Sequence, residues 1–107
     1  LVSYMSKNTK KYPLPLIIAT VYSFFNKLFI YHSIENKSEA PKLLGISPYF
    51  INEYREASVF FSMKRISRIF GYLLEADKRS KGIEFDNTDQ LGILNDLIYK
   101  IFKSNQL

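Results

Sequence analysis

Apolar residues recur along most of this chain at steps of three and four positions, which is the spacing of one face of an α-helix. The first helix is predicted to begin at Pro15, because the prolines of Tyr12-Pro13-Leu14-Pro15 stop any earlier helix and suit the first turn of a new one. No alternation typical of a strand competes with this spacing. The core-facing positions of this long helix are Ile17, Val21, Phe24, Phe25, Leu28, Phe29 and Tyr31.

A shorter helix and a turn are predicted next. Ser38 is the expected cap of a helix that ends at Leu44, and Gly45 supplies the left-handed residue that stops it. Ser47-Pro48 then begins another helix, which we expect to end near residues 59–61. Its apolar face is formed by Phe50, Ile51, Tyr54 and Ala57.

Two further helices complete the pattern. Ser62 is a suitable cap for the first and Gly82 a suitable stop, and Thr88 is the expected cap of the second. Gly71, inside the first, costs about 1 kcal/mol relative to Ala, so we expect a close helix–helix contact there. The apolar positions are Ile66, Ile69, Phe70, Leu73, Leu74 and Ala76 in the first, and Leu91, Leu94, Leu97, Ile98, Ile101 and Phe102 in the second.

Helices joined by short connections predict an all-α bundle of about five helices. The 107 residues, 47% hydrophobic and 23% charged, have the size and composition of one domain, residues 1–107, with a single core. The opening Leu1-Val2-Ser3-Tyr4-Met5 is typical of the tail of an amphipathic helix and lacks an initiator Met. We therefore expect a C-terminal piece of a longer protein.

The location of the protein is predicted from features that the sequence lacks. The chain has no cysteine and shows no signal peptide, which together favour a reducing, cytoplasmic location. The longest apolar stretch, residues 15–34, falls short of a bilayer-spanning run because polar residues interrupt it, so we expect no membrane partner. These interruptions are Thr20, Ser23, Asn26, Lys27 and His32.

No set of residues predicts enzymatic chemistry, so we expect a protein that is not an enzyme, with no catalytic, cofactor-binding or metal site. The glycines are isolated and none precedes Lys-Ser or Lys-Thr, which excludes a phosphate-binding loop. His32 is the single histidine, and its place at a helix end favours an interaction with the helix dipole. Neighbouring carboxylates, such as Glu53 with Glu56, are interpreted as solvated surface.

Residues 39–58 have the spacing of a DNA-binding helix-turn-helix, and a regulator domain that reads DNA through them is the alternative hypothesis. The formal net charge of +5 is compatible with an anionic partner but too small to decide. Pro48 and Tyr49 occupy the first positions of the would-be recognition helix, and phosphates would repel Glu53 and Glu56 behind them. The turn is therefore interpreted as structural.

A basic face on the helix predicted after Ser62 is a second candidate for function. Its arginines and a tyrosine follow steps of three and four away from the main apolar stripe, and this mixture is favoured at protein interfaces. A solvated face explains the same pattern equally well. Asp77 and Lys81, four positions apart, favour an ion pair within the helix. The residues that follow these steps are Arg65, Arg68, Tyr72, Glu75 and Arg79.

Three stretches of the chain follow one another in the order of a known family. The first runs from Tyr12 to Tyr22 and on to Tyr31-His32, and the second is Leu44-Gly45-Ile46-Ser47-Pro48-Tyr49-Phe50. The third, residues 73–82, reads Leu-x-Glu-x-Asp-x-x-x-Lys-Gly. Together they resemble the C-terminal domain of the DNA polymerase III delta-subunit family, whose pattern includes Leu-Gly-hydrophobic-x-Pro-aromatic and this helix end.

The resemblance implies a helical collar domain that joins the gamma or tau and delta-prime subunits of the clamp loader. The ATP-driven complex opens the beta sliding clamp and places it on primed DNA during replication, so this domain would meet clamp and DNA only through the whole complex. The family's clamp-opening element lies in an N-terminal domain, which we expect to lie outside this chain. The implied subunit interface, in which Asp77 and Lys81 connect across helices or subunits, comprises Arg65, Arg68, Tyr72, Asp77, Arg79 and Lys81.

Overall fold

The computed structural model describes residues 14–81 and 87–104, and their side chains except those of residues 87–89; this part of the chain is helical and contains no strand. The all-α prediction is confirmed. The predictions for residues 1–5, Gly82 and the Thr88 side chain lie outside the described residues. The elements are α2 (Leu14–Ser33), the 3-10 turn η1 (Lys37–Glu39), α3 (Ala40–Leu44), the 3-10 turn η2 (Pro48–Phe50), α4 (Ile51–Phe60), α5 (Met63–Lys81) and α6 (Asn87–Lys103).

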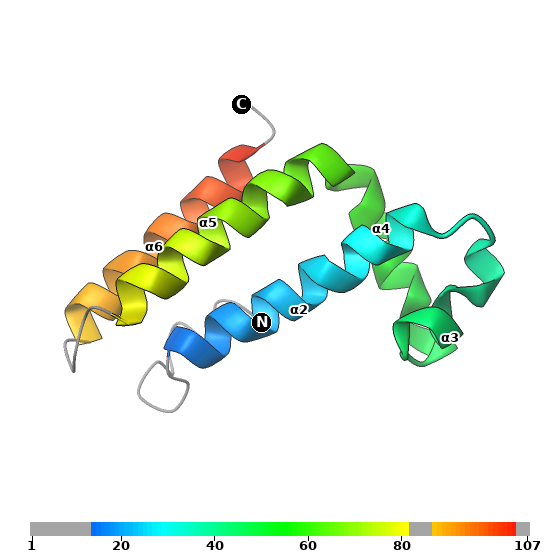
Figure 1. The fold of residues 1–107 in the computed structure, drawn as a ribbon, viewed down its shortest axis with the longest axis horizontal. Helices are drawn as coiled ribbons and strands as arrows, with labels where there is room; N and C mark the ends of the chain where they lie inside the picture. Colours follow the sequence, from blue (N-terminus) through cyan, green and yellow to red (C-terminus); the bar gives the residue numbers. More distant parts are fainter. Residues whose placement is uncertain (1–13, 82–86, 105–107) are drawn as a thin grey trace.

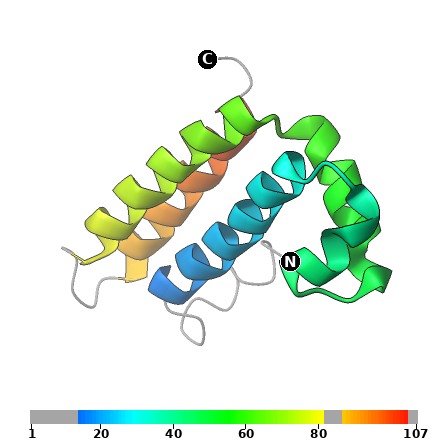
Figure 2. The same ribbon diagram turned by 45° about the vertical axis from the view of Figure 1, so that its right-hand side comes forward.

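Helix α5 lies at the centre of the arrangement. It packs along α2 and along α6, and the α5–α6 pair runs side by side (Figure 1). Helices α3 and α4 pack against α2 and lie at the end of the molecule where α2 ends (Figure 2). The three long helices therefore form the body of the bundle, and α3 and α4 form a smaller lobe.

The core is formed where the apolar faces of α2, α5 and α6 meet. Leu28 and Ile66 have no exposed surface, as the spacing of three and four predicts. Leu14 and Ile18 of α2 and Ile93 of α6 are also buried, although the predicted stripes omitted them. Because other elements pack on α2 from several directions, its buried face is wider than one stripe.

Some of the residues predicted to face the core do not. Phe50 is 48% exposed, Leu74 57% and Phe102 69%, because each lies at the edge of its stripe and no described element covers it. The close helix–helix contact predicted at Gly71 is also wrong. Gly71 lies on the outward side of α5, and a Cβ atom added there would meet nothing within 4 Å.

The helix ends are closed mostly by the predicted residues. Gly45 ends α3 with a φ of 68°, a left-handed conformation that glycine adopts without strain. The Ser62 hydroxyl accepts the Arg65 N–H, which confirms the predicted cap, and the Ser47 hydroxyl accepts the Tyr49 N–H at the start of η2. The cap predicted at Ser38 is wrong, because Asn36 takes that role and its Oδ1 accepts from both the N–H and the hydroxyl of Ser38.

Helix α2 is long and apolar enough, by length and composition, to cross a membrane. The polar interruptions therefore do not bring residues 15–34 below the requirement for a span, in contrast to the expectation from sequence. In the bundle α2 packs along α5, and 33% of the 18-residue window that meets this criterion is buried. Core helices of soluble proteins meet the same criterion, so the absence of a membrane partner stays a prediction.

Candidate interaction surface

Arg65, the first of the six predicted interface residues, makes its contacts within the chain. Its Nη1 donates to the Phe60 carbonyl at 2.8 Å, and its Nη2 to the Ile101 carbonyl at 3.1 Å. Its Nε donates to the Ser104 hydroxyl at 2.5 Å. The guanidinium also lies over the Phe61 ring, 4.4 Å from its centroid. Arg65 therefore joins the end of α4 to the end of α6.

Arg68 meets the same end of α6. Its Nη1 donates to the Ser104 carbonyl at 3.1 Å, and Ser104 has no exposed surface. Two arginines from the beginning of α5 thus face the C-terminus of α6, where the helix dipole favours positive charge. This placement gives both arginines a structural function whether or not a subunit also contacts them.

The α5–α6 ionic network consists of Glu75, Arg79, Asp96 and Lys100. The Asp96 Oδ2 lies 3.1 Å from the Arg79 Nη1 and 3.1 Å from the Lys100 Nζ. The Lys100 Nζ also lies 3.2 Å from the Glu75 Oε1, and 5.9 Å from the ring centroid of the predicted interface residue Tyr72. Arg79 and Tyr72 therefore both face α6 through this network.

Charge pairing within the network shifts two pKa values. The hydrogen bond from Lys100 lowers the pKa of the Asp96 carboxyl against an opposing effect of desolvation, and Arg79 lowers it further. Hydrogen bonds to Asp96 and then to Glu75 raise the pKa of the Lys100 ammonium. The side chains of the network are 32–54% exposed, so each pair contributes at most about 1 kcal/mol to stability.

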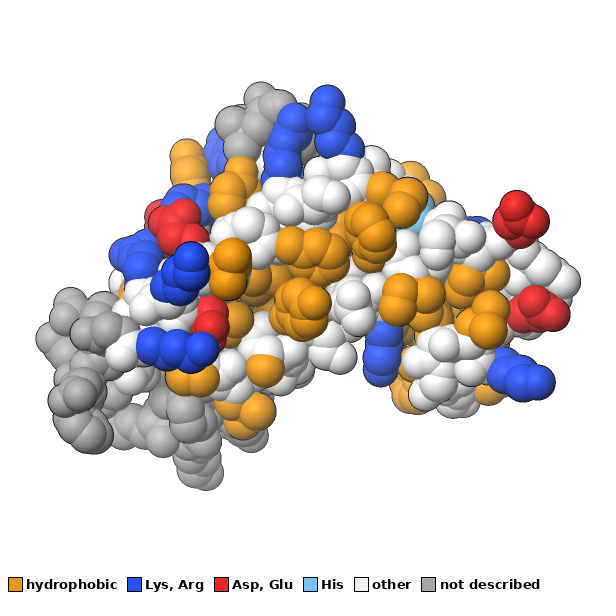
Figure 3. Space-filling view, viewed as in Figure 1, with side chains coloured by type: hydrophobic (Ala, Val, Ile, Leu, Met, Phe, Trp, Pro, Cys, Tyr) orange, Lys and Arg blue, Asp and Glu red, His pale blue; other side chains and the backbone are white. Residues whose placement is uncertain are grey.

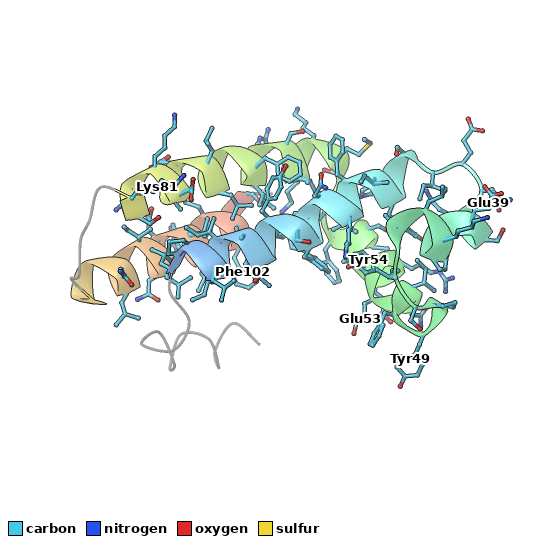
Figure 4. The ribbon with its side chains drawn as sticks, turned by 60° about the horizontal axis from the view of Figure 1, so that its bottom comes forward. Glu39, Tyr49, Glu53, Tyr54, Lys81 and Phe102 are labelled. Carbon is cyan, nitrogen blue, oxygen red and sulfur yellow. The ribbon has the colours of Figure 1, made fainter. Side chains whose placement is uncertain are left out.

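Asp77 and Lys81 bind each other at the end of α5. Their Oδ2 and Nζ atoms lie 2.9 Å apart, which confirms the ion pair predicted within the helix. Lys81 is labelled in Figure 4, where it marks the last turn of α5. The implied connection of this pair to other helices or subunits stays a prediction.

An exposed apolar surface runs along α2 and α5. Figure 3 shows hydrophobic side chains gathered over these two helices. Tyr22 and Phe70 lie in contact across the helices, with ring centroids 5.3 Å apart, and the hollow beside them has a volume of about 230 Å³. Tyr22 is 48% exposed and Leu74 is 57% exposed. This α2–α5 surface is defined by Pro15, Ala19, Tyr22, Phe70 and Leu74.

The α2 part of this surface was missed by the sequence prediction. Pro15, Ala19 and Tyr22 follow one another at steps of four and three, which is itself a helical stripe beside the core stripe. A second stripe on one helix is a signal that the sequence carries. The predicted interface lies wholly on α5 and does not include this stripe of α2.

The segment 39–58 forms the predicted helix, turn and helix. At its tip Tyr49 is 85% exposed, and Tyr49 and Glu53 point away from the body of the protein (Figure 4). Three glutamates in this segment oppose one lysine and one arginine, which gives a net charge of −1. The surface that would approach DNA is therefore slightly acidic, and phosphates would oppose its approach.

His32 has a specific partner in addition to its position in the last turn of α2. Its Nε2 donates a hydrogen bond to the Phe61 carbonyl at 2.6 Å, which ties α2 to the junction of α4 and α5. Within residues 14–81 and 87–104, no three His, Asp or Glu side chains are grouped so that they could hold a metal ion.

No family model matches this chain, and comparison with curated proteins and with solved structures finds no match either.

Proposed function

We propose that this protein is a non-catalytic oligomerisation domain of the collar type, acting in the cytoplasm as part of a DNA polymerase III delta subunit in the clamp loader. Its partners are the gamma or tau and delta-prime subunits, and it meets the beta clamp and primed DNA only through the complex. The proposal builds on the resemblance of residues 12–32, 44–50 and 73–82 to that family.

The observation that carries the proposal is the exposed apolar α2–α5 surface. A surface of this kind, with Tyr22 and Leu74 about half exposed, is typical of proteins that bury it against a partner. An aromatic pair at its centre and an ion pair at its edge match the composition of protein interfaces. Arg65 and Arg68 of α5 do not belong to this surface, because they bind Ser104 at the end of α6.

Co-purification with the gamma or tau and delta-prime collar domains of the same genome tests the proposal. We expect a mixed complex that persists from low to moderate salt, because apolar contacts are screened little by ions. Leu74→Asp should weaken it at least tenfold, which corresponds to about 1.4 kcal/mol. The matched control is Tyr99→Asp, since Tyr99 is 63% exposed on α6 and lies outside the α2–α5 surface.

Two results would overturn the proposal. One is the absence of any mixed complex, and the other is equal weakening by Leu74→Asp and Tyr99→Asp. Binding of duplex DNA that falls steeply as salt rises would favour the helix-turn-helix hypothesis instead. In that case a change at Arg55, which is exposed on α4, should reduce DNA binding and the Leu74→Asp change should not.

A further inference from the structure

A second apolar surface lies on the other side of α2. It is a groove of about 420 Å³ between α2 and α6, with Phe61 at one end. Phe102, which is 69% exposed and labelled in Figure 4, belongs to its α6 wall. The groove is lined by Ile17, Thr20, Val21, Phe24, Phe25, Phe61, Leu94, Leu97, Ile98, Ile101 and Phe102, and we call it the α2–α6 groove.

The packing of the bundle explains why the groove is open. Helices α2 and α6 each pack along α5, but the two diverge from each other, as Figures 1 and 2 show from two directions. Their buried apolar residues belong to the common core, and their more exposed apolar side chains, such as Phe102, line the groove. Ten of its eleven lining side chains are hydrocarbon or aromatic, and the eleventh, Thr20, uses its hydroxyl to donate to the Leu16 carbonyl. The groove is thus suited to an apolar occupant.

We propose that residues 1–5 of this same chain are the occupant of the α2–α6 groove. On a helical turn Leu1, Tyr4 and Met5 fall on one side and Ser3 falls on the other, so the segment has one apolar face. The polar residues 6–11, which include three lysines, separate this face from the start of α2. Because an apolar groove would not stabilise these polar side chains, the proposal places them outside it.

The connection between residues 1–5 and α2 is long enough for this segment to reach the α2–α6 groove. The nine residue steps from Met5 to Leu14 can span at most about 30 Å, whereas the groove wall from Ile17 to Phe24 is only about 10 Å of helix. The segment can therefore turn back and lie antiparallel to α2. A tether of this length gives an effective concentration of the order of millimolar, which favours this segment over a second copy of the chain in dilute solution.

A tryptophan reporter tests the proposal in the full chain. The protein has no tryptophan, so Tyr4→Trp introduces the only one. We expect blue-shifted emission that is independent of protein concentration, together with weak quenching by acrylamide. Phe102→Ser should shift the emission to the red and raise the quenching constant severalfold. Tyr99→Ser is the matched control on the same helix and should leave both unchanged, because Tyr99 lies outside the groove.

A second pair of variants distinguishes loss of binding to the groove from unfolding of the protein. Thr20→Glu places a charge on the groove wall at an exposed position of α2, and Ser23→Glu places the same charge on the outward side. With helicity unchanged, only Thr20→Glu should expose the tryptophan. Red, strongly quenched emission in Tyr4→Trp alone would overturn the proposal. A blue shift that appears only as concentration rises would also overturn it and assign the groove to a second copy.

Discussion

The Arg65 guanidinium and the Ser104 hydroxyl, which come from residues 39 positions apart, lie 2.5 Å from each other at the point where α6 ends. The Ser104 hydroxyl, which accepts from Arg65, also donates a hydrogen bond to the Ile101 carbonyl at 2.6 Å. Arg65 also reaches the Ile101 and Phe60 carbonyls directly. One side chain at the start of α5 therefore fixes the ends of two other helices.

Replacing Arg65 by Lys tests this role. A lysine keeps the charge but cannot supply the planar fork that reaches several acceptors at once, so we expect a loss of about 1–3 kcal/mol in the free energy of unfolding. Chemical denaturation followed by circular dichroism measures the loss. Lys64→Arg, at the exposed neighbouring position, is the control and should change stability by less than about 0.5 kcal/mol.

The exposed Gly71 offers a stabilising change. Gly71→Ala should raise the free energy of unfolding by about 0.5–1 kcal/mol, because the added methyl meets no neighbour and alanine restricts the unfolded chain. Gly45→Ala is the contrasting variant. With a φ of 68° at Gly45, it should lower stability by about 1–2 kcal/mol although space is available there too. Equal effects of the two changes in thermal denaturation would contradict this account.

Lys37 closes the end of α2 from beyond the helix. Its Nζ donates to the Tyr31 carbonyl at 2.6 Å and to the Ile34 carbonyl at 2.5 Å, and it lies 4.7 Å from the Tyr31 ring centroid. Lys37→Met keeps the aliphatic stem and removes the donors, and should cost about 0.5–1.5 kcal/mol. Lys42→Met, also exposed, is the control. Amide exchange in the last turn of α2 should accelerate only in Lys37→Met.

The α5–α6 ionic network predicts a pH dependence of stability. The Asp96 pKa is lowered by folding, so its contribution is present above about pH 4 and is lost as pH falls through the lowered folded-state pKa. The Lys100 pKa is raised, so its contribution is present below about pH 10 and is lost as pH rises through the raised value. Asp96→Asn should remove about 0.2–1 kcal/mol at neutral pH.

Unfolding titrations at several pH values measure the Asp96→Asn effect. The difference from the parent protein should shrink as pH falls below about 4, because the parent carboxylate is then protonated as well. Glu56→Gln, an exposed carboxylate on α4, is the matched control and should show no such convergence. A difference between Asp96→Asn and parent that stays constant down to pH 2 would contradict the role of the ion pairs.

The sequence predicted the helices because local signals determine them. The spacing of Ile66, Ile69 and Leu73 and the caps at Gly45 and Ser62 depend on residues close in the chain, and the structure confirms them. The Ser38 cap was wrong because the helical turn η1 begins before Ser38: Asn36 caps it by accepting the Ser38 N–H, and Ser38 lies inside the turn. Local spacing could not distinguish these two caps.

The candidate surfaces were harder to predict, since they depend on how helices sit against one another. The spacing of Arg65 and Arg68 does not show that α6 ends beside them. The same spacing therefore fitted an exposed subunit interface as well as a contact within the chain. Leu74 and Phe102 fit the core pattern and are exposed only because no described element covers that side. Burial at the edge of a stripe is decided by tertiary packing, which periodicity does not encode.

During translation, helix α2 is synthesised before the helix that covers most of its apolar surface. Its main partner, α5, follows later in the sequence, and at about 5–20 residues per second the roughly 50 residues from the end of α2 to the end of α5 take about 2–10 s to synthesise. During that interval a helix apolar on most of its circumference, and long enough to enter a bilayer, has only α3 and α4 to cover it. Newly made chains should therefore depend on chaperones that shield apolar segments, and faster translation of residues 34–81 should raise the yield of soluble protein.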